Sequence, residues 1–182
     1  MIDARDAPTC WIIAGPNGAG KTTFALEYLP NAVGCRQFVN ADLIAAGMSP
    51  LAPESERMSA GRLFLTEIER HVRARTDFGF ETTLAGRAYL RLIHRLREAG
   101  WRVELIYLAL SAPQMARQRV AERVAHGGHD IPREEIERRF HRGLANLFSY
   151  YMVAVDRVDC LLNEREQPEP VFVWRDGKLD VL

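Results

Sequence analysis

Hydrophobic residues gather in short runs along this sequence, and the runs alternate with longer stretches in which apolar side chains recur every three or four positions. Such alternation is typical of an α/β fold. Five runs have strand character, at residues 10–14, 37–40, 78–82, 103–110 and 158–162. The fourth is almost continuously apolar, which indicates a strand that is covered on both faces. We therefore expect a three-layer α/β fold with a mostly parallel central sheet.

The intervening stretches have helical spacing. Helices are predicted at residues 22–29, 42–48, 55–75, 86–99 and 111–125, and from 132 to about 151. Pro30 is expected to stop the first helix and Gly100 to end the fourth. Ser111 is expected to open the fifth helix through a capping box. The third helix has an expected apolar stripe that consists of Gly61, Phe64, Leu65, Ile68 and Val72.

The last part of the sequence has the pattern of a β-hairpin. Two apolar strings, at residues 171–174 and 179–182, lie on either side of Asp176-Gly177. An Asp-Gly pair between two strings of this kind favours a tight hairpin turn. No repeat, low-complexity tract or internal linker interrupts the chain, and its 182 residues suit one domain. We expect that domain to span residues 1–182.

Composition places the chain among ordinary globular proteins, with 47% hydrophobic and 26% charged residues. The formal net charge is zero, so nothing in the overall charge indicates nucleic acid or a membrane surface as a partner. The three cysteines are odd in number and widely spaced, which suits a reducing cytoplasm. Residues 1–6 lack the order of a signal peptide, and no apolar run is long enough to span a bilayer. We expect a cytoplasmic enzyme or binding domain.

A glycine-rich segment follows the first predicted strand and opens the first helix. It reads Gly15-Pro16-Asn17-Gly18-Ala19-Gly20-Lys21-Thr22 and matches the complete Walker A pattern of phosphate-binding loops. In this pattern the backbone N–H groups and the helix N-terminus surround a triphosphate. Lys21 is expected to reach the β- and γ-phosphates, and the Thr22 hydroxyl to bind Mg²⁺. We predict ATP and Mg²⁺ as cofactors, with Thr23 included in the nucleotide site.

The motifs of two other nucleotide-binding classes do not occur in the sequence. It contains no NKxD sequence for guanine recognition, and neither an LSGGQ signature nor a long aliphatic run that ends in Asp-Glu. These absences disfavour a GTPase and an ABC-type ATPase. The sequence therefore favours a compact P-loop kinase with an acceptor pocket and a helical lid.

Acidic and hydroxyl side chains lie where the acceptor of such a kinase binds. Asp42 follows the second strand and can either accept the proton of an acceptor hydroxyl or cap the next helix; spacing alone leaves the two interpretations equal. Glu81 lies at the carboxyl end of the third strand, where parallel sheets bind ligands. Thr83 and Arg87 follow it and complete the expected substrate site, although Thr83 can also serve as a helix cap and Arg87 as a solvated arginine.

Seven arginines lie between residues 117 and 142, among acidic residues. Such a pattern occurs in solvated helix pairs that are held by their own ion pairs. The Gly127-Gly128 break also indicates a hinge, so the two helices can form a lid that moves arginines over a transferring phosphoryl group. The candidate arginines are Arg119, Arg123, Arg138 and Arg139. His129 can bind phosphate or cap the turn.

Four features together resemble the zeta-toxin family of P-loop kinases, in its short, single-domain branch. They are the Walker A loop, Asn40-Ala41-Asp42, Glu81-Thr82-Thr83-Leu84 and Gly127-Gly128-His129-Asp130-Ile131-Pro132, and the resemblance covers residues 10–163. Zeta toxins phosphorylate the 3′-hydroxyl of UDP-N-acetylglucosamine with ATP and are held in check by an antitoxin. The resemblance therefore implies a kinase with this small-molecule acceptor and an antitoxin partner.

The resemblance also implies a role for each matching residue. Lys21 and Thr22 would hold the ATP phosphates and Mg²⁺, and Asp42 would be the general base. Glu81, with Thr83 beside it, would bind the sugar nucleotide. The lid residues that sense phosphate would be Arg123 and one of Arg138 or Arg139. The chain departs from the short branch at Asn163-Glu164, where relatives have Asn-Ser.

Two other hypotheses are compatible with the same residues. The protein can be a kinase of another hydroxyl acceptor, such as an antibiotic or a nucleotide. It can also be an ATP-dependent binding or regulatory protein of a toxin–antitoxin pair, without significant transfer. Asp42 and Glu81 favour a kinase, because a pure binding switch needs neither carboxylate.

Overall fold

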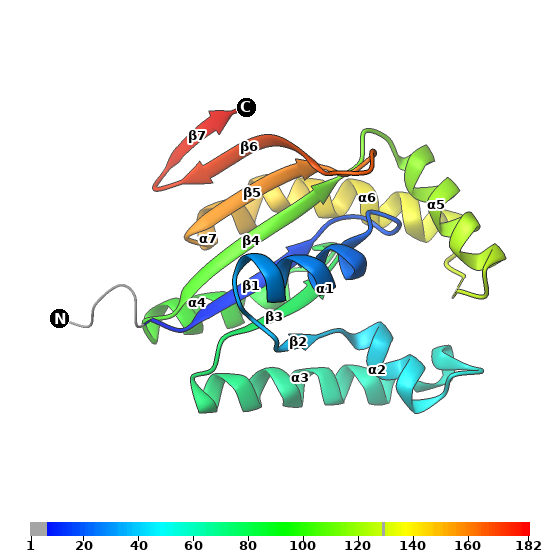
Figure 1. The fold of residues 1–182 in the computed structure, drawn as a ribbon, viewed down its shortest axis with the longest axis horizontal. Coiled ribbons are helices and arrows are strands. Elements are labelled where there is room, and N and C mark those ends of the chain that lie inside the picture. The colour runs from blue at the N-terminus through cyan, green and yellow to red at the C-terminus, as the bar shows by residue number, and fades with distance from the viewer. Residues whose placement is uncertain (1–6, 129) are drawn as a thin grey trace.

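The computed structural model describes residues 7–128 and 130–182, so residues 1–6, which bear on the signal-peptide expectation, and His129 lie outside it. Its strands form one seven-stranded sheet in the order β2-β3-β1-β4-β5-β6-β7 (Figure 1). The strands are β1 Thr9–Ala14, β2 Phe38–Val39, β3 Phe78–Thr82, β4 Arg102–Ala109, β5 Arg157–Leu162, β6 Glu169–Arg175 and β7 Lys178–Val181. Strands β1 to β5 pair in parallel, and β6 and β7 are antiparallel additions. The predicted α/β fold with a mostly parallel sheet is confirmed.

Helices connect the strands and cover both faces of the sheet (Figure 1). They are α1 Lys21–Ala32, α2 Ala41–Met48, the 3₁₀ turn η1 Pro53–Glu56, α3 Arg57–Ala74, α4 Tyr89–Glu98, α5 Pro113–Ala125, α6 Arg133–Asn146, the π-helical turn η2 Leu147–Tyr151 and α7 Met152–Ala154. None of the helices in the described part of the chain is long and apolar enough to cross a bilayer.

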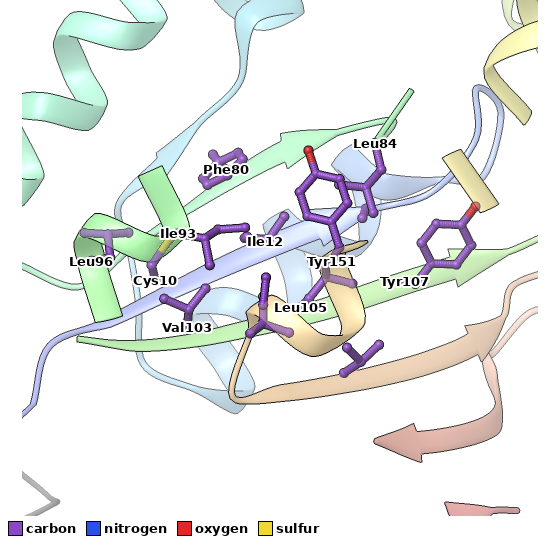
Figure 2. Close-up of a cluster of buried hydrophobic side chains, with 14 of the residues drawn as sticks. Cys10, Ile12, Phe80, Leu84, Ile93, Leu96, Val103, Leu105, Tyr107 and Tyr151 are labelled. Atoms are coloured by element: carbon purple, nitrogen blue, oxygen red, sulfur yellow. The ribbon is translucent and has the colours of Figure 1, made fainter. Parts of the chain in front are cut away.

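Alternate residues of each central strand enter two separate hydrophobic cores. Ile12 of β1 lies in a core that α3, α4 and η2 cover, with Phe80 and Leu105 of the neighbouring strands around it (Figure 2). Ile13 faces the opposite core, beneath α1, α5 and α6. Because a strand alternates its side chains, both faces of β1 and β4 need apolar residues, as their nearly continuous apolar sequence predicts.

The predicted C-terminal hairpin is confirmed. Strands β6 and β7 pair through Arg175 and Lys178, which leaves Asp176 and Gly177 as a two-residue turn. Both turn residues have positive φ values, of 53° and 75°. This conformation suits the right-handed twist of a hairpin, and Asp-Gly adopts it readily.

Two predicted helix boundaries are wrong. Pro30 does not stop α1, which continues to Ala32. A proline in the final turn removes only one hydrogen bond of a helix that is about to end. Helix α4 begins at Tyr89 rather than at Gly86. The reason is tertiary: the Tyr151 hydroxyl donates a hydrogen bond of 2.8 Å to the Gly86 carbonyl and holds it outside the helix.

Two finer predictions also fail. Ser111 does not cap α5; the N-cap is Ala112, without a side-chain bond, and the Ser111 N–H instead donates to Glu164. Leu65 is 56% exposed, although it belongs to the predicted stripe of α3. The buried residues of α3 are Ala60, Phe64, Ile68 and His71. The helix is therefore rotated so that His71 takes an inward position that hydrophobicity alone does not indicate.

Candidate active site

The glycine-rich loop lies between the end of β1 and the start of α1. Gly15 has a φ of 142°, and a Cβ atom there would stand 2.3 Å from the Leu108 carbonyl oxygen of β4. Only glycine permits this contact with the neighbouring strand. The Pro16 carbonyl then accepts a hydrogen bond from the Ala19 N–H at 3.2 Å. Packing and backbone bonds therefore hold the loop in shape.

Lys21 is the first residue of α1 and is only 6% exposed. Its ammonium group donates to the Pro16 carbonyl at 2.9 Å and lies 3.6 Å from the Glu81 carboxylate. Burial lowers the pKa of Lys21, and the negative charges of Glu81 and Asp42 act in the opposite direction. The lysine is therefore a buried cation that two carboxylates compensate.

Three side chains from three segments meet beside this lysine. Glu81 accepts hydrogen bonds of 2.6 Å from the Thr22 hydroxyl and 2.6 Å from the Asn40 amide, and the same amide lies 3.3 Å from the Thr22 hydroxyl. The sheet register explains the meeting, because Ile13 pairs with Glu81 in the parallel β1–β3 ladder. Glu81 thus reaches the level of the loop that follows β1.

The two interpretations of Asp42 are now separated. Asn40 is the N-cap of α2, and its side-chain oxygen accepts from the N–H groups of Asp42 at 2.8 Å and Leu43 at 3.1 Å. The alternative in which Asp42 caps the helix is therefore wrong. Asp42 lies in the first turn of α2 and lines the cavity described next. Its role as a general base stays a prediction.

A cavity of about 700 Å³ opens above the loop and joins most of the predicted site. The predicted residues along it are Asn17, Gly18, Lys21, Thr22, Asp42, Glu81, Thr83, Arg123, Arg138 and Arg139. They come from the loop, from α2, from the end of β3 and from α5 and α6, the two helices predicted to form a lid. The structure thus brings the nucleotide, acceptor and lid candidates to one place.

The predicted loop residues Gly15, Pro16, Ala19 and Gly20 do not border the cavity, and three further predicted residues lie elsewhere. Thr23 points out from α1 and is exposed. Arg87 does not line the cavity; its guanidinium stacks on the Tyr150 ring at 3.8 Å and contacts Asn146. Arg119 donates to the Asn163 carbonyl at 2.6 Å. The Asn163 amide in turn donates to the Ala19 carbonyl at 2.8 Å, so this pair supports the loop from the β5 side.

The lid arginines have partners within the lid and also line the cavity. Arg138 and Arg139 both pair with Glu135, at 2.8 Å for Arg138, and together they hold the pKa of that carboxyl below its usual value. Arg117 of α5 pairs with Glu137 of α6. The expectation that the arginines form ion pairs within the two helices is therefore confirmed for these residues. Arg138 and Arg139 nevertheless border the cavity as well. Hinge motion at Gly127-Gly128 stays a prediction.

Several residues that line the cavity were not predicted from the sequence. Asn40 is one, although an asparagine just before an acidic helix start is a known capping signal. Tyr89 of α4, Glu54 of η1, Arg57 of α3 and Arg142 of α6 also line the cavity. Nothing local in the sequence distinguishes these four from surface or core residues. Only the packing of α2, α3 and α6 around the sheet assigns them to the site.

The residues present fit ATP and Mg²⁺. Asn17 is 8% exposed and borders the cavity, and its side-chain oxygen is buried without a hydrogen-bond partner within the described part of the chain. An amide oxygen is an acceptor, so it is suited to a metal ion or to a donor group of a ligand. The Thr22 hydroxyl and the Glu81 carboxylate are oxygen donors of the kind Mg²⁺ prefers, and Lys21 supplies charge for phosphate.

Comparison with known proteins agrees with this geometry. The family model of an AAA domain, AAA_33, matches residues 10–144, well over half of the chain. An uncharacterized protein of Haemophilus influenzae is 29% identical over 130 residues, which cover 69% of this chain and 88% of that protein.

Solved structures share the fold at low sequence identity. The AvrRxo1-ORF1:ORF2 complex matches with a TM-score of 0.72 and 15% identity over 96% of this chain, which spans 61% of that chain's length. The PezAT toxin–antitoxin system of Streptococcus pneumoniae matches with a TM-score of 0.67 and 14% identity over 95% of this chain and 79% of the other. Shikimate kinase from Acinetobacter baumannii matches with a TM-score of 0.51 and 19% identity, over 89% of this chain and 86% of the enzyme.

The family match covers the loop, both carboxylates and the lid, and the fold matches extend over most of the chain. The chain therefore belongs to the AAA_33 family of AAA domains, and its fold is that of a P-loop kinase, in agreement with the zeta-toxin resemblance of its motifs.

Proposed function

We propose that this protein is an ATP-dependent small-molecule kinase, formed by one domain, that transfers the γ-phosphate of ATP to a hydroxyl group of a metabolite. The observation that carries the proposal is the shared cavity of Lys21, Thr22, Glu81 and Asp42. A nucleotide-binding switch needs ligands for the phosphates and the metal ion but no base for an acceptor. The carboxylate of Asp42 in the same cavity supports an acceptor that must lose a proton.

Each residue has a distinct part in the proposed reaction. Lys21 binds the β- and γ-phosphates and stabilises the negative charge that develops as the bond to the γ-phosphorus breaks. Thr22 would hold Mg²⁺, which would neutralise phosphate charge when bound. Glu81, which the resemblance assigns to the acceptor, lies beside Thr22 and could serve as a second oxygen donor to the metal. Asp42 accepts the proton of the acceptor hydroxyl as its oxygen bonds to the phosphorus. Arg123, Arg138 and Arg139 orient the transferred group from the lid.

UDP-N-acetylglucosamine is our first-choice acceptor, through the resemblance to zeta toxins. The contacts of Glu81 with Thr22 and Lys21 support a place for this carboxylate near the phosphates. Thr83, Tyr89 and Arg57 then form the acceptor wall of the cavity. A different hydroxyl acceptor is the alternative. Similarity to shikimate kinase and to a gluconokinase from Sinorhizobium meliloti, with a TM-score of 0.53, supports phosphotransfer without selecting between acceptors.

A protein partner is part of the proposal. Two structurally similar proteins were solved as a two-component complex and as a toxin–antitoxin system. These neighbours support an antitoxin-like partner for this chain.

Mass spectrometry of acceptor panels tests the proposed function. The protein is incubated with ATP, Mg²⁺ and hydroxyl acceptors that include UDP-N-acetylglucosamine, and products are searched for the gain of one phosphoryl group. Lys21→Ala and Asp42→Asn should each abolish the product. Lys178→Ala is the matched control, because Lys178 is the other lysine of the chain and lies exposed in β7. A product that survives Lys21→Ala would contradict the proposal.

A further inference from the structure

The amide side chain of Asn40 connects three segments of the site. It is 4% exposed and lies between the end of β2 and the start of α2. Its oxygen accepts from the N–H groups of Asp42 and Leu43. Its nitrogen donates to Glu81 at 2.6 Å and lies 3.3 Å from the Thr22 hydroxyl oxygen. One short side chain thus contacts the acceptor helix, the carboxylate of β3 and the phosphate loop helix.

The two ends of this amide do different things. The oxygen fixes the first turn of α2, which carries Asp42. The nitrogen fixes the Glu81 oxygen that also accepts from Thr22. Asparagine is suited to both tasks, because its short side chain has a donor and an acceptor at the same distance from the backbone. Serine can replace the capping acceptor, but it has one polar atom on a shorter side chain for both tasks, where asparagine has two separate atoms.

The same contacts define the hydrogen-bonding state of Thr22. A threonine hydroxyl has one proton and two acceptor lone pairs. The proton is donated to Glu81, and one lone pair is directed at the Asn40 amide. The other lone pair is then the one that a metal ion can use. Asn40 and Glu81 together therefore fix the orientation of the hydroxyl and leave one lone pair for a metal ion.

We propose that Asn40 is a positioning residue that sets the placement of Asp42 relative to Thr22 and Glu81, and so couples the acceptor side of the site to the metal side. The expected effect of Asn40 on turnover rests on the proposed kinase function. The expected effect of Asn40 on Mg²⁺-dependent nucleotide binding does not, because binding needs no phosphotransfer. A residue that only capped α2 would lack this second effect.

Two variants separate capping from positioning. Asn40→Ser keeps a capping oxygen, and Asn40→Ala removes both functions. Thermal unfolding should be close to wild type for Asn40→Ser and lowered for Asn40→Ala. Calorimetry with a non-hydrolysable ATP analogue then measures binding with and without Mg²⁺. We expect the gain in affinity from Mg²⁺ to fall about tenfold in Asn40→Ser, since the Thr22 hydroxyl is no longer oriented.

Turnover provides the second measurement. With any acceptor that wild type phosphorylates, Asn40→Ser should lower kcat about tenfold or more and change KM for that acceptor less than about threefold. Wild-type values for Asn40→Ser in both measurements would show that Asn40 is only a helix cap and would overturn the proposal. Absence of transfer by wild type itself would count against the kinase function, and the Mg²⁺-dependent binding would still decide the role of Asn40.

Discussion

A Cβ atom on Gly143 would stand 2.4 Å from the carbonyl oxygen of Thr83, so helix α6 approaches the end of β3 only because residue 143 is glycine. This contact places the lid helix beside the strand end that carries Glu81 and Thr83. The close approach is a property of packing, since Gly143 lies within a regular helix where any residue can adopt the backbone conformation.

The first prediction concerns Gly143→Ala. The added methyl group must push α6 away from Thr83, and overpacking of this kind costs about 1–3 kcal/mol of unfolding free energy. Gly61→Ala in α3 is the matched control, because a Cβ there meets nothing within 4 Å. In that helix alanine should stabilise by about 0.5–1 kcal/mol. Urea unfolding of both variants measures the difference, and equal effects would contradict the contact.

The second prediction concerns the buried pair of Lys21 and Glu81. Glu81→Gln leaves Lys21 as a buried cation with one of its two compensating carboxylates removed, so unfolding free energy should fall by about 1–3 kcal/mol. A double variant that also carries Lys21→Met removes the buried cation as well. The double variant should therefore be at least as stable as Glu81→Gln alone, and a double-mutant cycle in urea measures the coupling. Purely additive losses would show that the two side chains do not interact.

The third prediction concerns His71 and pH. This side chain is buried, stacks on Phe78 and hydrogen-bonds with the Thr76 hydroxyl at 3.1 Å. Burial, and next the charge of Arg70, lower the pKa of His71 below its usual value of 6.5. Above that value both the folded and the unfolded protein hold a neutral imidazole. As pH falls through 6.5 the unfolded chain binds a proton first, so the unfolding free energy declines until the lowered pKa of the folded state is passed.

Urea unfolding between pH 7.5 and about 5 checks this expectation, a range that brackets the ordinary titration of histidine. His71→Gln keeps a polar side chain for Thr76 and should flatten the decline. His94→Gln is the control, because His94 is an exposed residue of α4. An equally steep decline in His71→Gln would assign the acid sensitivity to other groups.

The fourth prediction concerns the lid. Glu135 pairs with Arg138 and Arg139, so a phosphate group that binds these arginines must compete with its carboxylate. Glu135→Gln removes that competitor and should tighten ATP binding about three- to tenfold at low salt, with the gain reduced at high salt. Calorimetry at two salt concentrations measures it. Glu134→Gln, an exposed neighbour in the same helix turn, should leave affinity unchanged. A gain of the same size in Glu134→Gln would indicate a general charge effect.

The phosphate loop and the sheet were predictable because their signals are local. Glycine spacing identifies the loop, and continuous apolar runs identify strands that are covered on both faces. The pairing of Thr22 with Glu81 was not predictable, since the two residues are 59 positions apart and meet only through the β1–β3 register. Sequence indicates the strand that ends in Glu81, and the order of strands in the sheet decides what Glu81 contacts.

Two other features, the cap of α2 and the position of Arg87, depended on which of several nearby residues makes a given contact. Asp42 and Asn40 both suit a helix cap, and the structure assigns the cap to Asn40. Arg87 follows the strand that ends in the site, but Leu84 has a φ of 55° and Tyr151 holds the Gly86 carbonyl. These two features turn the chain so that Arg87 stacks on Tyr150 outside the cavity. Neither feature has a sequence signal. A positive φ at leucine is uncommon, and the bond between Tyr151 and Gly86 joins residues that are 65 positions apart.

The meeting of Thr22, Asn40 and Glu81 has a thermodynamic consequence. The three residues belong to segments that only the pairing of β1, β2 and β3 brings together, so an unfolded chain has no such site. A nucleotide that binds there binds the native state alone and opposes unfolding by mass action, by about 2.7 kcal/mol when its concentration is about a hundred times Kd. For a protein of ordinary marginal stability this is a large share of the total. The cellular nucleotide pool would then set how long the folded protein survives.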